Sequence, residues 1–278
     1  TLVSTSSAPF YNPQTMNADA VTIRLALLLC IVFYVGSLLR LRTGSAGAFL
    51  IVKNSATSLA KVTSLNARRR YVEARAMSAI DLKRFADRGY DKTNGIYGTV
   101  PHKYVKSQLF ESVRQALQLK SVNIFLDSGL FVDLGSGEGE LVLSALEHYP
   151  CLGKAIGIEL CNSRHEAAVA AAAQSPACIQ SRLRLVESDI CDLGDPLVSG
   201  ALRDARVAFA NNLAFDKRLQ ERLGQVLSET IARRGGFSIV LATAPLRWHG
   251  RRNIRKASMV TGSWMQTVPL YVDIVLPA

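Results

Sequence analysis

Short apolar runs and amphipathic stretches alternate regularly through the second half of the chain. The apolar runs predict buried parallel strands at 130–134, 155–160, 183–187, 207–210 and 237–242. Between most of them, helical periodicity predicts helices at 139–148, 163–173 and 219–232. A last pair of runs, 259–266 and 270–276, has no helix between its halves. The pattern predicts an α/β fold with an open, doubly wound, mostly parallel sheet and a C-terminal antiparallel hairpin.

The N-terminal third shows a different pattern. Residues 1–24 are predicted to form a disordered tail, since Ser, Thr, Asn and Pro dominate its start. Residues 25–41 contain an uncharged apolar run (25–39) between Arg24 and Arg40, which favours a membrane anchor or a targeting segment. Residues 42–89 are interpreted as a basic linker and an N-terminal helical extension, and 90–278 as the α/β domain. Positive charge after the apolar run would keep that domain on the cytoplasmic side.

Charge and cysteine content narrow the class of protein. The net charge is +11, and the first 75 residues are strongly basic. A basic arm suits nucleic acid, a nucleosome or an anionic membrane, although a solvated linker is an equally good interpretation. The five cysteines include no C-x-x-C pair, so the sequence indicates neither a metal site nor a disulfide framework and suits a reducing compartment.

The most informative motif follows the first predicted strand. An acid ends the strand and a G-x-G-x-G loop follows it, formed by Asp133, Gly135, Ser136, Gly137 and Gly139. Glycine lets the backbone turn sharply and lets a ligand approach closely. A dinucleotide site has G-x-G-x-x-G instead, and a carboxylate at this position repels a diphosphate. The same carboxylate suits the ammonium group of S-adenosylmethionine (SAM), so a SAM site is favoured over an ordinary glycine turn.

Polar residues at the ends of the later strands extend this site. Glu159 ends the second strand and can accept hydrogen bonds from both hydroxyls of a ribose. Asp189 can accept one from an adenine amino group, while Ile190 packs on the ring. Asn211 and Asn212 follow the fourth strand, where such a pair either binds polar groups of cofactor and substrate or forms a turn.

These residues resemble the disruptor-of-telomeric-silencing family, the histone-lysine methyltransferases with a Rossmann-like SAM-binding fold. The resemblance covers about residues 90–278 and is carried by the glycine loop, the Gly157-Ile-Glu159 step and Asn211-Asn-x-Ala-Phe215. It implies a cofactor loop at Tyr97-Gly98 and lysine-channel aromatics at Trp264 and Tyr271. Thr99 stands where the family has glutamate, so this loop lacks the carboxylate that the resemblance would place over the cofactor.

The resemblance implies SAM-dependent methylation of a lysine of the nucleosomal core histone, in the nucleus. The proposed reaction residues are Asn212, Phe215, Trp264 and Tyr271. An aromatic channel would disfavour the lysine ammonium by desolvation and so favour the neutral nucleophile. Two alternatives stay open: a membrane-anchored methyltransferase of a non-histone protein, and a degenerate SAM-binding module.

A basic segment follows the fifth predicted strand, near the expected mouth of the pocket. Five cations in ten residues could bind DNA phosphates or an acidic histone surface, or could form a solvated loop. They are Arg247, Arg251, Arg252, Arg255 and Lys256.

Overall fold

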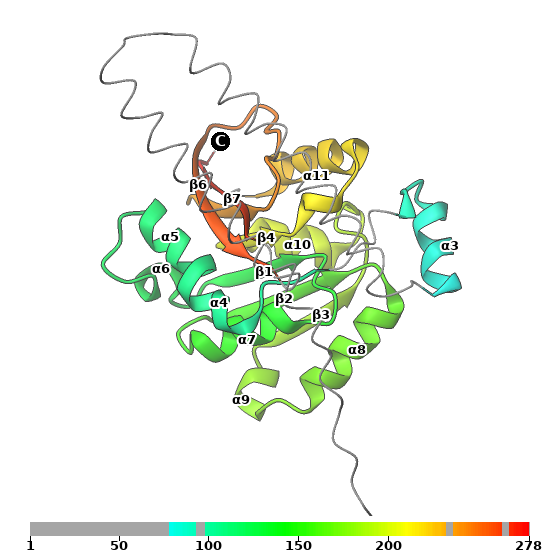
Figure 1. Cartoon of the computed structure of the whole chain (residues 1–278), viewed down its shortest axis with the longest axis horizontal. Coiled ribbons are helices and arrows are strands. Elements are labelled where there is room, and N and C mark those ends of the chain that lie inside the picture. Colours follow the sequence, from blue (N-terminus) through cyan, green and yellow to red (C-terminus); the bar gives the residue numbers. More distant parts are fainter. Residues whose placement is uncertain (1–77, 93–97, 232–235, 263–266, 278) are drawn as a thin grey trace, which may run out of the picture. The chain divides into compact units, whose positions relative to one another are not determined.

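A computed structural model describes residues 78–92, 98–231, 236–262 and 267–277 (Figure 1). The predicted tail (1–24), the apolar segment (25–41) and most of 42–89 lie outside these residues, as do Tyr97 and Trp264. Among the helices that the structure describes, none has the length and apolar character needed to cross a membrane.

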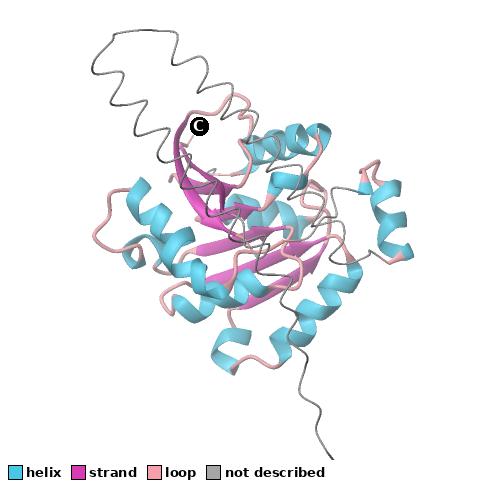
Figure 2. Cartoon of the chain, viewed as in Figure 1, coloured by secondary structure: helices cyan, strands magenta, loops and turns pink. Residues whose placement is uncertain are grey.

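In the part of the chain that the structure describes, seven strands form one mixed sheet in the order β3-β2-β1-β4-β5-β7-β6. The first five are parallel to one another, and β7 runs antiparallel between β5 and β6 (Figure 2). The strands are β1 Leu130–Leu134, β2 Lys154–Glu159, β3 Leu183–Glu187, β4 Val207–Ala210, β5 Ser238–Ala242, β6 Asn253–Thr261 and β7 Thr267–Val275. This arrangement confirms the predicted doubly wound, mostly parallel sheet of a Rossmann-like fold.

Helices cover both faces of the sheet and build a core on each. Phe131 belongs to one core and Val132 to the other, because neighbouring strand residues point to opposite faces. The main helices are α3 Ala79–Asp87, α5 Glu111–Ala116, α7 Glu140–His148, α8 Asn162–Ala173, α10 Pro196–Asp204 and α11 Lys217–Thr230. Short elements are α4 His102–Tyr104, a π-helical segment Val105–Phe110, α6 Asn123–Leu126, α9 Ala177–Gln180 and a 3₁₀ turn Asn212–Ala214.

The strand order reverses between β1 and β4, which lie side by side while their connections run to opposite sides. In open α/β sheets, ligands bind beyond the carboxyl ends of the strands at such a reversal. The fold therefore places the glycine loop after β1 and the asparagine pair after β4 at the expected ligand site.

The predicted hairpin boundaries were wrong. Pro269 lies inside β7, opposite Met259, and β6 begins at Asn253. Proline is tolerated there because β5 pairs only with Tyr271 to Val275, so at Pro269 one edge of β7 has no β5 partner. Helix α10 was missing from the prediction, although Asp195 caps its first turn and Pro196 occupies its first position.

Candidate functional site

The glycine loop folds over the end of β2. Gly135, Gly137 and Gly139 have φ angles of 84°, 55° and 78°, which favour glycine. The backbone N–H groups of Gly135 and Ser136 both donate to the Ile158 carbonyl, at 2.9 and 3.0 Å. Apart from its chain neighbours, no heavy atom of the described residues would lie within 4 Å of a Cβ placed on Gly135, so space is open above this glycine in the described part of the chain.

Glu159 closes the loop from the other side. Its carboxylate accepts hydrogen bonds from the N–H groups of Gly137 and Cys161, each at 2.8 Å. Burial raises the pKa of this carboxyl, and the nearby Arg164 opposes the rise. Each carboxylate oxygen retains acceptor capacity for a further donor, so Glu159 can bind hydroxyl groups while holding the loop.

A cavity lies at this edge of the sheet, with about 590 Å³ of space between the atoms, open solvent included. Among the described residues, six predicted site residues line it: Gly135, Glu159, Asp189, Ile190, Asn211 and Phe215. Gly98, beside the predicted cofactor-loop tyrosine, lines it too. The remaining lining residues are Phe85, Tyr90, Leu134, Leu160, Arg164 and Leu219. The structure thus brings together residues from five separate stretches of the chain.

Sequence reasoning missed the aromatic side of this cavity. The Tyr90 hydroxyl donates to the Asp189 carboxylate, at 2.7 Å from Oδ2 and 3.0 Å from Oδ1. Burial raises the pKa of Tyr90, so the phenol is a neutral donor. Asp189 Oδ1 also accepts the Cys191 N–H at 2.8 Å. No local motif distinguishes Phe85 or Tyr90 from ordinary core residues, since their partners lie far away in the sequence.

Asp133 does not line the cavity. It is only 4 % exposed, and among the described residues no hydrogen-bond donor contacts its carboxylate. Burial, aided by the negative charge of Glu159, raises its pKa to about 8. A buried carboxylate without a donor is unfavourable unless it is protonated or gains a cationic partner. Asp133 is therefore a candidate for binding a cationic group.

The neighbouring asparagines differ in position. Asn211 lines the cavity, and its Nδ2 donates to the Gly98 carbonyl at 2.6 Å, which ties the end of β4 to the cofactor-loop segment. Asn212 is fully buried outside the cavity lining. Its side chain donates to Gln220 and to the Ala244 carbonyl, and accepts the Ala244 N–H at 2.8 Å. These contacts indicate that Asn212 holds the scaffold; its predicted role in the reaction stays a prediction.

The predicted lysine channel is placed only in part. Phe215 lines the cavity, whereas Tyr271 lies half-buried on β7 outside the lining, with the Arg255 guanidinium 5.7 Å from its ring centroid. Trp264 and Tyr97 lie outside the described residues. Ser136, Gly137 and Gly139 are buried in the loop beside the cavity.

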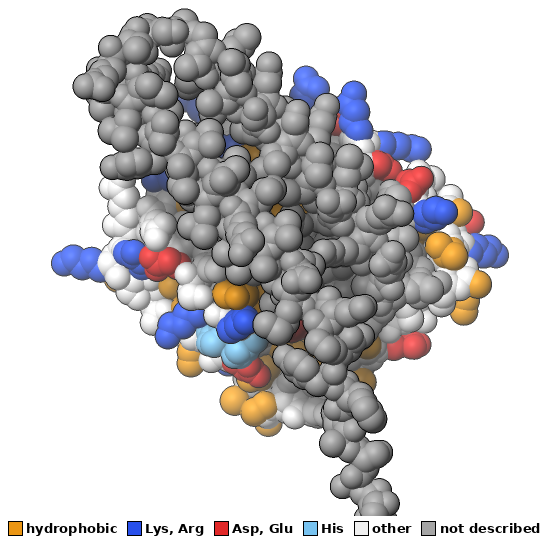
Figure 3. Space-filling view, in the orientation of Figure 1, with side chains coloured by type: hydrophobic (Ala, Val, Ile, Leu, Met, Phe, Trp, Pro, Cys, Tyr) orange, Lys and Arg blue, Asp and Glu red, His pale blue; other side chains and the backbone are white. Residues whose placement is uncertain are grey.

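Three of the five predicted surface cations bind within the protein. Arg255 pairs with the buried Asp273 at 2.6 Å, Arg251 donates to the Ser228 carbonyl, and Lys256 donates to the Ala116 carbonyl. Arg255 and Lys256 belong to β6 rather than to a loop. In the view of Figure 3, the cations of described residues are interspersed with acidic side chains. Only Arg247 and Arg252 of this segment are exposed without such a contact among the described residues.

The chain matches the family model described as "Histone methylation protein DOT1" over residues 87–261 and belongs to this family. The match confirms the resemblance to the disruptor-of-telomeric-silencing family. No curated protein sequence matches the chain.

Solved structures of other methyltransferases are similar to part of the chain. One is an RNA methyltransferase from Salinibacter ruber in complex with S-adenosyl-L-homocysteine, with 15% identity and a TM-score of 0.39, covering 61% of this chain and 90% of that one. Another is the magnesium protoporphyrin IX methyltransferase of Synechocystis PCC 6803 with bound SAM, with 13% identity and a TM-score of 0.43, covering 76% and 90%. A third is TrmN from Thermus thermophilus, with 17% identity and a TM-score of 0.44, covering 60% and 48%.

Proposed function

We propose that this protein is a SAM-dependent lysine N-methyltransferase whose substrate is a nucleosomal core histone. Membership of the DOT1 family supports the reaction and the substrate. The observation that carries the cofactor assignment is the cavity at the carboxyl ends of the parallel strands, where the glycine loop, Glu159, Asp189 and Asn211 meet.

The residues at this cavity fit SAM. Glu159 has acceptor capacity for the two ribose hydroxyls, and Ile190 offers an apolar surface beside the Asp189 carboxylate for the adenine. The open space above Gly135 admits the ligand close to the backbone. Asp133 lies outside the lining but directly before Leu134 and Gly135, which belong to it; buried without a donor among the described residues, it is suited to the ammonium group.

When bound, SAM supplies a methyl group that is already activated by its sulfonium. The protein then has to position the nucleophile and exclude water. Phe215, half-buried at the cavity, offers an apolar ring for the wall of the lysine channel, and Tyr271 and Trp264 are the predicted remaining walls. Apolar surroundings favour the neutral amine, which is the form that attacks.

Incubation of the full chain with labelled SAM and a panel of nucleosomes, free histones, DNA and membrane proteins tests this proposal. We expect label on a histone lysine, identified by mass spectrometry, and loss of labelling in Gly135→Arg. Absence of SAM binding in calorimetry would overturn the whole proposal. SAM binding with the label on another residue type or on nucleic acid would overturn the lysine assignment.

A second candidate is a membrane-anchored methyltransferase of a non-histone protein, and the uncharged run 25–39 favours it. The two candidates differ in their location in the cell: a histone methyltransferase acts in the nucleus, whereas the second candidate is attached to a membrane. A fusion that carries residues 1–45 should resist carbonate extraction from membranes if the second candidate is correct. A freely soluble fusion, together with histone labelling, would favour the first.

A further inference from the structure

Helix α3 lies before the region that matches the family except for its last residue, Asp87, and both this helix and the turn after it contribute to the cavity. Phe85, near the end of α3, and Tyr90 both line the cavity. They are 6 % and 8 % exposed, and their rings meet edge-on with centroids 6.2 Å apart. The aromatic wall therefore depends on how α3 is held.

Apolar packing alone does not hold α3 in place. Only two residues of the helix are buried, Asp81 and Phe85, which lie four positions apart on one face. The apolar side chains of Ile80 and Leu82 are 65 % and 42 % exposed. Besides the packing of Phe85 in the core, the buried face of the helix therefore contributes polar contacts to its attachment.

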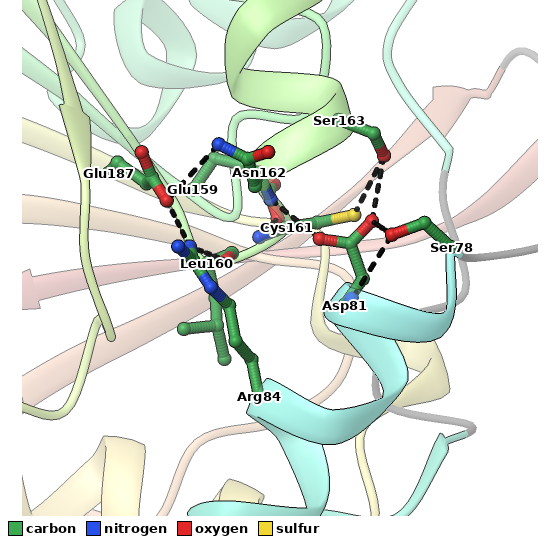
Figure 4. A network of polar contacts seen from close by, with 9 residues as sticks. All are labelled: Ser78, Asp81, Arg84, Glu159, Leu160, Cys161, Asn162, Ser163 and Glu187. Atoms are coloured by element: carbon green, nitrogen blue, oxygen red, sulfur yellow. Dashed lines mark hydrogen bonds and ion pairs between the residues drawn. The ribbon is translucent and has the colours of Figure 1, made fainter.

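Asp81 makes these contacts with the start of α8 (Figure 4). Its Oδ1 accepts the Asn162 N–H at 2.7 Å, and its Oδ2 accepts the Ser163 hydroxyl at 2.8 Å and the Ser78 hydroxyl at 2.6 Å. The residue before α8, Cys161, supplies no side-chain cap of its own. Asp81 thus caps α8 from another helix, where the helix dipole favours a carboxylate.

A second contact lies one turn further along α3. The Arg84 guanidinium pairs with Glu187 at the end of β3 and contacts the Leu160 carbonyl at 3.4 Å. The dashed contacts in Figure 4 run from α3 to the ends of both β2 and β3. Asp81 and Arg84 together attach the helix across the strand ends that carry the cofactor residues.

The two sets of contacts share a backbone segment. Glu159 Oε1 accepts the N–H of Cys161, and Asp81 Oδ1 accepts the N–H of Asn162, the next residue. The orientation of this short segment is thus set jointly by the predicted ribose-binding carboxylate and by Asp81. The two carboxylates are therefore connected through adjacent peptide units.

We propose that Asp81 and Arg84 are positioning residues that dock α3 beside the cofactor cavity, so that Phe85 and Tyr90 form the wall that contacts the adenosyl group. The inference rests on the proposed SAM site. Because the coupling is reciprocal, bound SAM should also hold α3 against the sheet.

The first test measures SAM binding and kinetics in the full chain for Asp81→Ala, Asp81→Asn and Arg84→Ala. The control is Asp87→Asn, at an exposed position of the same helix. We expect the Kd and the KM for SAM to rise about tenfold in Asp81→Ala, within the usual range of coupling between sites. The kcat at saturating SAM and the KM for the histone substrate should stay near the values of the unaltered protein.

Asp81→Asn keeps an acceptor for the Asn162 N–H and should recover part of the affinity. In the unaltered protein, SAM should slow hydrogen exchange in residues 79–87, and this protection should be lost in Arg84→Ala. Arg84 is partly exposed, so this variant remains informative if Asp81→Ala fails to fold.

Unchanged SAM affinity in folded Asp81→Ala and Arg84→Ala would overturn the inference, as would a loss of kcat with an unchanged KM for SAM. Failure of the unaltered protein to bind SAM would instead overturn the proposed function, so the two failures are distinguishable.

Discussion

Two buried aspartates, Asp133 in β1 and Asp81 on α3, have pKa shifts of opposite sign. Asp81 is inaccessible to solvent, and hydrogen bonds from Ser78, Cys161, Ser163 and Asn162 outweigh burial and lower its pKa to about 2. Asp133 is almost as deeply buried, and its pKa is raised to about 8. Burial disfavours the charge in both, so the difference comes from the donors around Asp81 and from the negative charge of Glu159 near Asp133. A buried carboxylate that accepts several hydrogen bonds holds secondary-structure elements together, whereas a buried carboxylate without donors is able to bind a cationic ligand.

The largest expected effect concerns another donor-saturated carboxylate, Asp273. It is inaccessible to solvent and accepts hydrogen bonds from Arg255, Trp248 and Asn253. Asp273→Ala should lower the free energy of unfolding by about 3–5 kcal/mol, because it leaves a guanidinium without its partner. Chemical denaturation measures this loss, with the exposed Asp204→Asn as control. If Asp133→Asn destabilised the ligand-free protein more than Asp273→Ala, the contrast between the two kinds of carboxylate would be wrong.

Next in size is the effect of Glu159→Ala on cofactor binding. The substitution removes the predicted ribose acceptor and releases the N–H groups of Gly137 and Cys161. The Kd for SAM should rise about 100-fold, which corresponds to roughly two hydrogen bonds to a charged group. Calorimetry measures the change, and Glu229→Gln on the exposed face of α11 serves as the control. If the Kd for SAM rose less than threefold, Glu159 would not be a cofactor-binding residue.

Substitutions of the two adjacent asparagines should have different effects, one mainly on stability and the other mainly on SAM binding. Asn212→Ala leaves the backbone groups of Ala244 without partners and should cost about 2 kcal/mol of unfolding free energy. Asn211→Ala breaks the contact with Gly98 and should raise the KM for SAM about fivefold with a smaller loss of stability. Melting curves and initial rates test both variants. If Asn212→Ala instead impaired turnover with SAM while Asn211→Ala mainly lowered stability, Asn212 would have the predicted role in the reaction.

The last prediction concerns a linkage between pH and Asp133, whose effect on cofactor binding is the smallest. Its folded pKa of about 8 lies above the unfolded value of about 3.9, so between these values the native state holds a proton that the unfolded chain releases. The contribution of Asp133 to the unfolding free energy should therefore fall as pH rises from about 4 to about 8.

Binding of a cation should expel this proton, up to about one per site at pH 7. Calorimetry of SAM binding in two buffers with different ionisation enthalpies counts the protons released, and Asp133→Asn is the reference. Equal proton release by the unaltered protein and by Asp133→Asn would show that Asp133 does not face the ammonium group.

The strand pattern and the glycine loop were predictable because each depends on local sequence. Every parallel strand lies within one residue of its predicted bounds, since a short apolar run between turns has few other ways to be buried. The end of the sheet was less predictable, because the position of Pro269 is tolerated only where β5 stops pairing. Arg255 also looked like a surface cation until its partner Asp273 was placed beside it.

The sequence by itself determined the α/β fold, the glycine loop and Glu159, because turn geometry and strand burial act over a few residues. Tertiary structure alone decided which buried carboxylates have donors, which asparagine faces the cavity, and that Phe85 and Tyr90 form its wall. These outcomes depend on groups brought together from distant parts of the chain, as in the hydrogen bonds between Tyr90 and Asp189 and between Asp81 and Asn162. Burial sets a cost for every such polar group, and the fold determines which groups find the partner that offsets it.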